Sequence, residues 1–262
     1  MIDIEEYFSR SIMLYGLPGF QRVQGSTVVV LGLGGVGSYA VEALARGGVG
    51  TLRLVDCDII KPTDINRQLL ALATNTGQKK VEAAASRLRS INPAIRLEIH
   101  DAFFHEDTAE ELLGGNPDFI VDAIDSLNPK AELIAQCIRR QLPVVSALGA
   151  AGKTDPAMVR FGTLRKTEIC PLARALRKYL NNRHVPADIP VVYSLERPVS
   201  PHPDGPRSIP ETGGTYVRGR QRQSLPSLPT IPAIFGLIAA NYVVLELAKE
   251  KRQLADPFAD FG

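Results

Sequence analysis

A glycine-rich turn near the start of the chain constrains the fold more than any other segment. The run Gly32–Gly37 (GLGGVG) follows the β-branched stretch TVVVL and opens the helical stretch SYAVEALAR. Glycines allow the backbone to approach a phosphate closely, and a helix N-terminus offers free N–H groups and a partial positive charge. Asp56 ends the next strand, TLRLVD, where its carboxylate can accept hydrogen bonds from a ribose diol. The pattern predicts a nucleotide site that contains Gly32, Gly34, Gly35, Gly37 and Asp56.

Strands and helices alternate over the first part of the chain. Beyond the first two strands, apolar segments predict three more, at 96–104, 118–125 and 142–150, and helices between them at 78–91, 107–115 and 128–141. Asp107 or Thr108 can cap the helix at 107–115. Such alternation is typical of a mostly parallel sheet with right-handed crossovers. We therefore predict a doubly wound, Rossmann-like α/β fold, with an N-terminal helix and the nucleotide-binding core in residues 1–150.

Residues 151–262 have a looser pattern and form a C-terminal elaboration in this interpretation. It holds strands at 158–164 and 191–198 and a basic helix at 171–183. A loop at 198–232, with eight prolines and several arginines, cannot be a regular element. The apolar run at 231–248 contains Pro232, Asn241 and Glu246, whereas a membrane span usually needs about 20 uninterrupted apolar residues. We expect a buried helix there and no stable membrane span.

Composition excludes several classes of protein. The formal net charge is only +2, so any nucleic-acid contact must come from a local basic patch. The three cysteines form no CxxC pair, which excludes a four-cysteine zinc site and favours a reducing compartment. The mixed, acidic start MIDIEEYFSR is not typical of a secretory signal, so we expect a cytoplasmic protein.

The glycine-rich turn alone serves NAD and ATP equally well, and the residues beyond it favour ATP. They are Asp58, Asn66, Arg67, Gln68, Lys80 and Asp125. Asp125 follows the fourth strand, and the others follow the strand that Asp56 ends, so they are expected at one edge of the sheet. A triphosphate carries several negative charges and travels with Mg²⁺. Cations and a carboxylate therefore suit it better than they suit a nicotinamide.

At this point the chain resembles the E1-like activating enzymes of the ThiF/MoeB/HesA superfamily. The motifs that carry the resemblance are Tyr7-x-x-Arg10, GLGGVGS, DxD-x7-NRQ, GxxK and DAIDS, in that order. The resemblance implies that the turn and Asp56 hold adenosine and that Asn66, Arg67 and Lys80 hold phosphates. It further implies that Asp125 binds Mg²⁺, and that Arg10 reaches into the partner's site across a homodimer.

The second half is similar to the tRNA threonylcarbamoyladenosine dehydratase branch of this superfamily. The similarity lies in the segments INPAIRLEIHDAFF, CPLARALRKYLNNR, VVYSLERP and FGLIAANYVVLELAK, and is weakest at 200–228. It implies ATP-dependent cyclisation, a dehydration, of N6-threonylcarbamoyladenosine at position 37 of tRNA through an acyl adenylate. For tRNA contact we expect a basic set: Arg165, Lys166, Arg174, Arg177, Lys178, Arg183, Arg207, Arg218, Arg220 and Arg222.

The cysteines raise a separate question. Family members have an Asp before PLA, where this chain has Cys170, and we interpret the change as a helix-capping substitution. A nucleophile or persulfide carrier, served by a sulfur-relay partner protein, is the alternative. Cys137 fits a helix core, and the thiolate of Cys57, between two acids, is disfavoured.

Two other functions compete with the tRNA enzyme. The first is an adenylating activator of a ubiquitin-like sulfur-carrier protein, although such proteins usually carry the zinc cysteines that are missing here. The second is an NAD-dependent oxidoreductase or an inactive nucleotide-binding scaffold.

Overall fold

The computed structural model describes residues 4–186, 188–205 and 225–249. Its strands form a single sheet of seven in the order β3-β2-β1-β4-β5-β7-β6. They are β1 (Thr27–Leu31), β2 (Thr51–Val55), β3 (Arg96–His100), β4 (Phe119–Asp122), β5 (Val144–Ala147), β6 (Val159–Thr163) and β7 (Pro190–Ser194). All neighbours are parallel except β6 and β7, which pair antiparallel at one edge. The predicted mostly parallel sheet is confirmed.

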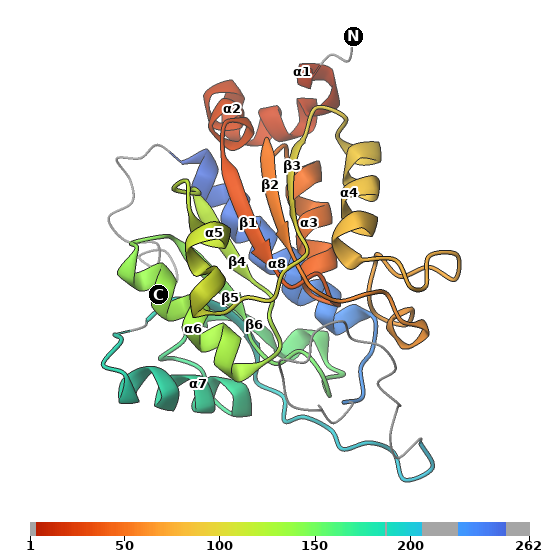
Figure 1. Ribbon diagram of the computed structural model, residues 1–262, viewed down its shortest axis with the longest axis vertical. Helices are drawn as coiled ribbons and strands as arrows, with labels where there is room; N and C mark the ends of the chain where they lie inside the picture. Colours follow the sequence, from red (N-terminus) through yellow and green to blue (C-terminus); the bar gives the residue numbers. More distant parts are fainter. Residues whose placement is uncertain (1–3, 187, 206–224, 250–262) are drawn as a thin grey trace.

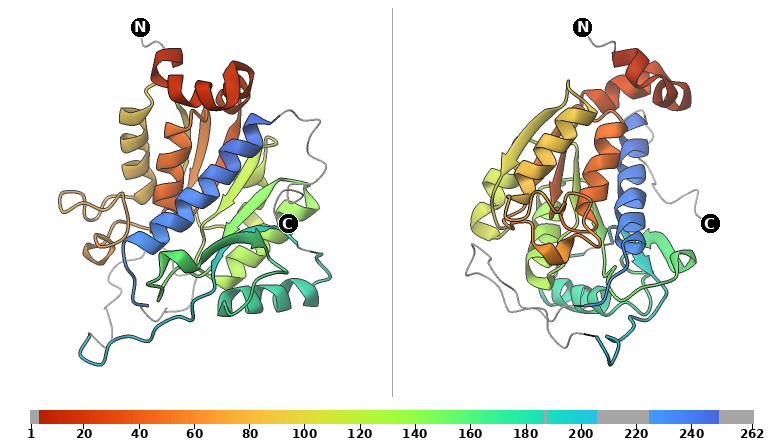
Figure 2. Two further views of the ribbon diagram at one scale, coloured as in Figure 1. Left: turned by 180° about the vertical axis from the view of Figure 1, so that it is seen from behind. Right: turned by 90° about the vertical axis from the view of Figure 1, so that its right-hand side faces the viewer.

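Helices cover both faces of the sheet, as a doubly wound fold requires. α3 (Gly37–Arg46), α4 (Lys80–Ile91) and α8 (Thr230–Ala248) pack on one face, toward the viewer in the left panel of Figure 2. α5 (Ala109–Leu113), α6 (Leu127–Arg139) and α7 (Pro171–Asn182) pack on the other, toward the viewer in Figure 1. The central strands β1, β4 and β5 are almost entirely buried, which explains their nearly continuous apolar sequences.

The order of the strands places a ligand site at one end of the sheet. From β1 the chain runs outward through β2 and β3 and then returns to β4, on the other side of β1. Crossover loops therefore diverge between the carboxyl ends of β1 and β4, and such switch points are where open α/β sheets bind ligands. The glycine-rich turn follows β1, and the DAIDS segment begins at the end of β4.

The N-terminal helices lie at the opposite end of the sheet. α1 (Ile4–Tyr7) and α2 (Ser9–Gln24) cross the amino ends of the strands, at the top of Figure 1. Gly16, with φ 74°, interrupts α2 two residues before Pro18, so the predicted N-terminal helix is kinked. Phe8 and Phe20 are buried, and their ring centroids are 5.3 Å apart.

α8 is the one described helix long and apolar enough to cross a membrane, but half of its apolar window is buried inside the protein. It packs along α3 and over β4 to β7, with Ile231, Phe235 and Val243 fully buried. Leu237 and Leu245 point outward and are 46% and 40% exposed. The expectation of a core helix is therefore met on one side only.

Some predicted details differ from the structure. The loop expected at 198–232 ends earlier, because α8 starts at Thr230 and Pro232 fits its first turn, where no N–H donor is needed. Neither Asp107 nor Thr108 caps α5 with its side chain; the Thr108 hydroxyl instead accepts a bond from the His105 amide. Residues 206–224 lie outside the described residues, and the division of the chain at residue 150 stays a prediction.

Candidate active site

The glycine-rich turn is built by close backbone contacts that no other residue allows. Gly32 has φ 88°, and a Cβ there would lie 2.8 Å from the carbonyl oxygen of Ala123. A Cβ on Gly37 would lie 1.7 Å from the carbonyl oxygen of Gly32. By contrast, a Cβ on Gly34 would have the Gln68 amide, at 3.9 Å, as its nearest neighbour. Gly32 and Gly37 therefore shape the turn, while Gly34 leaves its surface open to an approaching group.

Asp56 connects the end of β2 to this turn. One of its carboxylate oxygens accepts the backbone N–H of Leu33 at 2.6 Å, and the other accepts that of Asp58 at 2.8 Å. Burial raises the pKa of Asp56, and the Lys80 ammonium opposes that shift. The predicted ribose-binding carboxylate thus lies beside the turn, with its side chain held by two backbone donors.

Lys80 lies at the first turn of α4, and its ammonium is close to the carboxylates of Asp56 and Asp58. Its side chain is only 7% exposed, and Nζ donates to Asp58 across 2.9 Å. Burial alone would lower the pKa of Lys80, but the negative charges of Asp56 and Asp58 outweigh it and raise the pKa. Lys80 is therefore a desolvated, fully charged cation, which is the form that a phosphate group requires.

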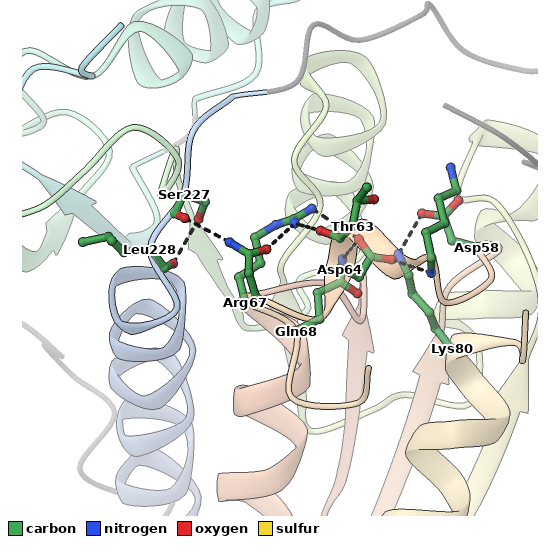
Figure 3. A network of polar contacts seen from close by, with 10 residues as sticks. Asp58, Thr63, Asp64, Arg67, Gln68, Lys80, Ser227 and Leu228 are labelled. Carbon is green, nitrogen blue, oxygen red and sulfur yellow. Dashed lines mark hydrogen bonds and ion pairs between the residues drawn. The ribbon is translucent and has the colours of Figure 1, made fainter. Parts of the chain in front are cut away.

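Asp64 is a carboxylate that the sequence analysis did not single out, and it organises the NRQ motif. It is 6% exposed and accepts hydrogen bonds from the Gln68 amide at 2.7 Å, the Arg67 guanidinium at 3.3 Å and the Lys61 N–H at 3.0 Å. Figure 3 shows Asp64 between these side chains and Lys80. A carboxylate three residues before an arginine was the available signal, since such a spacing allows an ion pair within one turn.

Asn66 and Arg67 form contacts that connect this network to the segment before α8. The Asn66 amide donates to the carbonyl of Ser227 at 3.1 Å, and its oxygen accepts from Arg67 at 3.1 Å. Arg67 also donates to the carbonyl of Thr63 at 2.7 Å. The side chains predicted to hold phosphates are therefore preordered by the protein itself, and the segment before α8 takes part through Ser227.

Asp125 follows β4, and the structure brings its segment against the glycine-rich turn. The carbonyl of Ala123, two residues before it, is the group that a Cβ on Gly32 would strike. The Asp125 residue itself is exposed. The other acid of the motif, Asp122, is fully buried and pairs with Lys130 at 2.6 Å, a contact that sequence reasoning missed. Asp125 is thus the acid of this motif that faces solvent at the switch point.

Arg10 is the one predicted catalytic residue that the structure does not bring to this edge. It is exposed on α2, at the amino ends of the strands, whereas the glycine-rich turn and Lys80 lie at the carboxyl ends (Figure 1). The Arg10 side chain is too short to extend from the amino ends of the strands to their carboxyl ends. Within a single copy of the chain, Arg10 therefore takes no part in the site.

The cysteines agree with most of what the sequence suggested. Burial, and then the charges of Asp58 and Asp56, raise the pKa of Cys57 to about 12. Cys137 is fully buried, and Cys170 is 3% exposed at the N-cap of α7, where its thiol makes no capping hydrogen bond. The position predicted for a helix cap is confirmed, but the capping bond is not formed.

One group of possible metal ligands occurs in the described residues. Ligand atoms of Asp56, Cys57 and Asp58 lie within 4.8 Å of one another. The group does not suit a cation, because Cys57 keeps its proton at neutral pH and the Lys80 ammonium already pairs with Asp58.

The basic residues of α7 and the turn before it divide into two sets. Arg165, Lys166, Arg174 and Lys178 are exposed. Arg177, in contrast, donates to the carbonyls of Leu164 at 3.1 Å and Thr167 at 2.9 Å, and is only partly exposed. Arg177 therefore also connects the 163–167 turn to α7 through hydrogen bonds, and its predicted contact with tRNA stays a prediction. Arginines 207, 218, 220 and 222 lie outside the described residues.

This arrangement of a glycine-rich turn, an aspartate after β2 and an NRQ–lysine cluster at the β1/β4 switch point defines a nucleotide-binding α/β protein. The family model described as "ThiF family" matches residues 8–261, and the chain belongs to this family.

Relatives of known name match nearly the whole chain. It is 36% identical over 244 residues to the tRNA threonylcarbamoyladenosine dehydratase of Bacillus subtilis, covering 93% of this chain and 95% of the relative. The E. coli enzyme of the same name, TcdA, solved in complex with ATP, superimposes with a TM-score of 0.83 at 33% identity, covering 97% and 99%. A molybdopterin-synthase adenylyltransferase of Salmonella typhimurium matches 62% of this chain at 33% identity.

Proposed function

We propose that this chain is an ATP-dependent tRNA threonylcarbamoyladenosine dehydratase. The observation that carries the proposal is the set of side chains gathered at the β1/β4 switch point, where Lys80 is buried and charged beside the glycine-rich turn. Relatives with this activity in their names match the second half of the chain as well as the first, whereas the molybdopterin-synthase adenylyltransferase does not extend so far.

The reaction is an adenylation followed by a ring closure. The carboxylate of the threonyl group attacks the α-phosphorus of ATP and releases pyrophosphate, which converts a carboxylate oxygen into part of a good leaving group. The carbamoyl oxygen then attacks the activated carbonyl and expels AMP, and a carbamoyl N–H loses its proton, so the base becomes a cyclic ester and loses one water overall. Because the closure is intramolecular, it needs no protein nucleophile.

The protein contributes mainly electrostatic stabilisation in this proposal. The free N–H groups at the start of α3 and the cations Arg67 and Lys80 face the phosphates, where negative charge grows during the attack. Asp56, held by two backbone donors, receives the ribose hydroxyls. Asp58, Asn66 and Gln68 complete the set of groups around the nucleotide.

Asp125 is the residue proposed to hold Mg²⁺. It fits because it offers hard oxygen ligands, is exposed, and follows β4 at the edge of the sheet that carries Lys80. When bound there, the cation would offset the charge of the triphosphate. A conservative Asp125→Asn change should therefore reduce pyrophosphate exchange more than it reduces binding of ATP without metal.

A homodimer is proposed from the position of Arg10, since its own site is out of reach. Exposed apolar side chains accompany it: Leu14 on α2 is 75% exposed, and Leu237 and Leu245 lie on the outer side of α8. Mixing Arg10→Ala with Lys80→Met chains tests the proposal. Mixed dimers would regain one intact site if Arg10 acts across the interface, whereas a mixture that stays inactive would contradict it.

The proposed tRNA contact uses the exposed residues Arg165, Lys166, Arg174 and Lys178. Changing all four to Ala should lower tRNA affinity and reduce the dependence of log K on log salt by up to about 0.9 per lost phosphate contact. A matched control changes Arg89 and Arg96, which are exposed on α4 and β3. Equal behaviour of both variants would remove the contact from the proposal.

We place the reaction in the cytoplasm.

Mass spectrometry of nucleosides tests the function directly. Modified tRNA incubated with the protein, ATP and Mg²⁺ should yield a nucleoside lighter by one water, with AMP and pyrophosphate as co-products. A sulfur-carrier activator would instead show pyrophosphate exchange that depends on a small carrier protein and not on the tRNA. A role of Cys170 with a sulfur-relay partner requires access to its thiol, and burial to 3% exposure speaks against it.

A further inference from the structure

A lysine, an aspartate and a serine form a closed polar network directly behind the switch point. Lys130 of α6, Asp122 at the end of β4 and Ser146 of β5 are all fully buried. The Lys130 ammonium donates to Asp122 at 2.6 Å, to the Ser146 hydroxyl at 3.1 Å and to the Ala147 carbonyl at 2.9 Å. All three N–H donors of the ammonium are therefore used.

The network reaches the site through the other carboxylate oxygen of Asp122. Oδ2 accepts both Lys130 and the Ser146 hydroxyl, the latter at 2.6 Å. Oδ1 accepts the backbone N–H of Ile124 at 3.1 Å. Asp122 thereby fixes the first bend of the chain after β4, the bend that presents Ala123 to Gly32 and leads into Asp125.

The following helix is fixed by the same lysine. Lys130 lies in the first turn of α6, and its backbone N–H donates to the carbonyl of Ser126 at 3.2 Å. The segment Ala123–Ser126 is therefore held at both ends by residues of one buried network. Movement of this segment would break the bond from the Ile124 N–H to Asp122 or the bond from the Lys130 backbone N–H to Ser126.

Stability alone gives little reason for such a pair. Removing two charges from water has a large cost, and apolar residues of similar volume often replace a buried ion pair without loss of stability. Directional bonds from an ammonium on α6 to groups of β4 and β5, however, fix the relative positions of these three elements in a way that apolar side chains cannot.

We propose that Lys130, Asp122 and Ser146 are positioning residues that hold Asp125 in the geometry needed for adenylation. The proposal rests on the proposed function, in which Asp125 binds Mg²⁺. Loss of residues that orient a metal ligand without contacting the metal typically lowers metal affinity or activity by about 10–100-fold.

The test replaces the network by apolar residues that can pack. The double variant Lys130→Met with Asp122→Leu removes both charges and leaves the Ile124 N–H without its acceptor. We expect the variant to fold, with a melting temperature moderately below that of the wild type, because the Ile124 N–H and the Ser146 hydroxyl lose their acceptor. In pyrophosphate exchange we expect about a tenfold or larger loss of kcat and a raised half-saturation for Mg²⁺. The affinity for ATP without metal, measured by calorimetry, should change little because the glycine-rich turn and Lys80 are untouched.

Two further variants serve as comparisons. Ser146→Ala deletes two bonds of the network with little change in volume and should show the same kinetic pattern in weaker form. Cys137→Ala lies on the same helix, buried outside the network, and should lower stability without changing the Mg²⁺ dependence.

The Asp125→Asn variant distinguishes a failure of the positioning role from a failure of the proposed role of Asp125. If it loses activity while the apolar double variant keeps wild-type kcat and Mg²⁺ half-saturation, the network is merely structural and this inference is wrong, whereas the proposed function stands. If Asp125→Asn keeps full activity, the role of Asp125 fails, and the positioning role fails with it.

Discussion

The Lys80 ammonium donates to Asp58 across 2.9 Å, and the two side chains differ sharply in exposure, at 7% and 52%. A buried cation is therefore paired with a carboxylate that still reaches water. The pairing keeps Lys80 charged in a place where burial alone would favour its neutral form. An anion that binds in the site therefore contacts a Lys80 ammonium that is already desolvated.

Removing the Asp58 charge should make nucleotide binding sensitive to alkaline pH. The pKa of Lys80 is raised above its usual value near 10.5, so its favourable contribution is present at lower pH and is lost as pH rises through the folded pKa. In Asp58→Asn that pKa falls, and calorimetry should show ATP affinity declining at a lower pH than in the wild type. Asp101→Asn, which affects only the pair with Lys79, is the control. Parallel pH profiles for all three proteins would contradict the expectation.

Two glycines of the turn should respond differently to the same substitution. Gly34→Ala places its Cβ 3.9 Å from the Gln68 amide, an ordinary van der Waals distance, so the melting temperature should hold. The affinity for ATP should fall, because the methyl group blocks the approach of a phosphate. Gly37→Ala collides with the carbonyl of Gly32 and should lower both. Thermal melts with and without ATP measure both quantities. Unchanged ATP affinity in Gly34→Ala would place the phosphates elsewhere.

Cys57 should react slowly with alkylating reagents although it is partly exposed. Its pKa of about 12 leaves roughly one thiolate in ten thousand at pH 8, about a thousandfold less than an ordinary thiol of pKa 9 has. Iodoacetamide labelling followed by peptide mass spectrometry should find it unmodified in the folded protein and modified in urea. Rapid labelling of the native protein at pH 8 would contradict the burial of Cys57 and the position of the acids beside it.

Two arginines of α7, Arg174 and Arg177, should differ in how much they contribute to the stability of the fold. Arg177→Ala leaves the carbonyls of Leu164 and Thr167 without their donor and should lower the free energy of unfolding by about 1–3 kcal/mol. Arg174→Ala, at an exposed position on the same helix, should stay within about 0.5 kcal/mol of the wild type. Urea unfolding measures both. Equal stabilities would show that the Arg177 contacts do not persist in solution.

The local patterns of the sequence predict most of the fold. The strands and the larger helices appear where periodicity and glycine turns place them, with errors at the ends: the helix expected from Gln78 begins at Lys80. The crossovers then bring the segments after β1, β2 and β4 together, as the rule for switch points implies. Asp125 and Lys80 could be chosen for that reason.

What could not be predicted depends on contacts between distant side chains. Asp122 and Lys130 belong to different elements, and no sequence pattern shows that both side chains turn inward. Asp64 presented a similar problem, since a carboxylate in a loop is usually solvated and only the fold buries it. For Arg177, the sequence shows the charge of the side chain and not the carbonyls that accept its hydrogen bonds.

The contact between α8 and the glycine-rich turn has a consequence for how the site comes into being. A Cβ on Gly236 would lie 2.2 Å from the carbonyl of Val36, and one on Gly35 would lie 3.1 Å from Pro232. The turn is therefore shaped against a helix that the ribosome makes some 200 residues later. A nascent chain that has emerged only through β5 holds every residue proposed to contact the nucleotide, yet lacks the surface that supports them. Nucleotide binding should consequently appear late in synthesis, in one step, when the last helix docks.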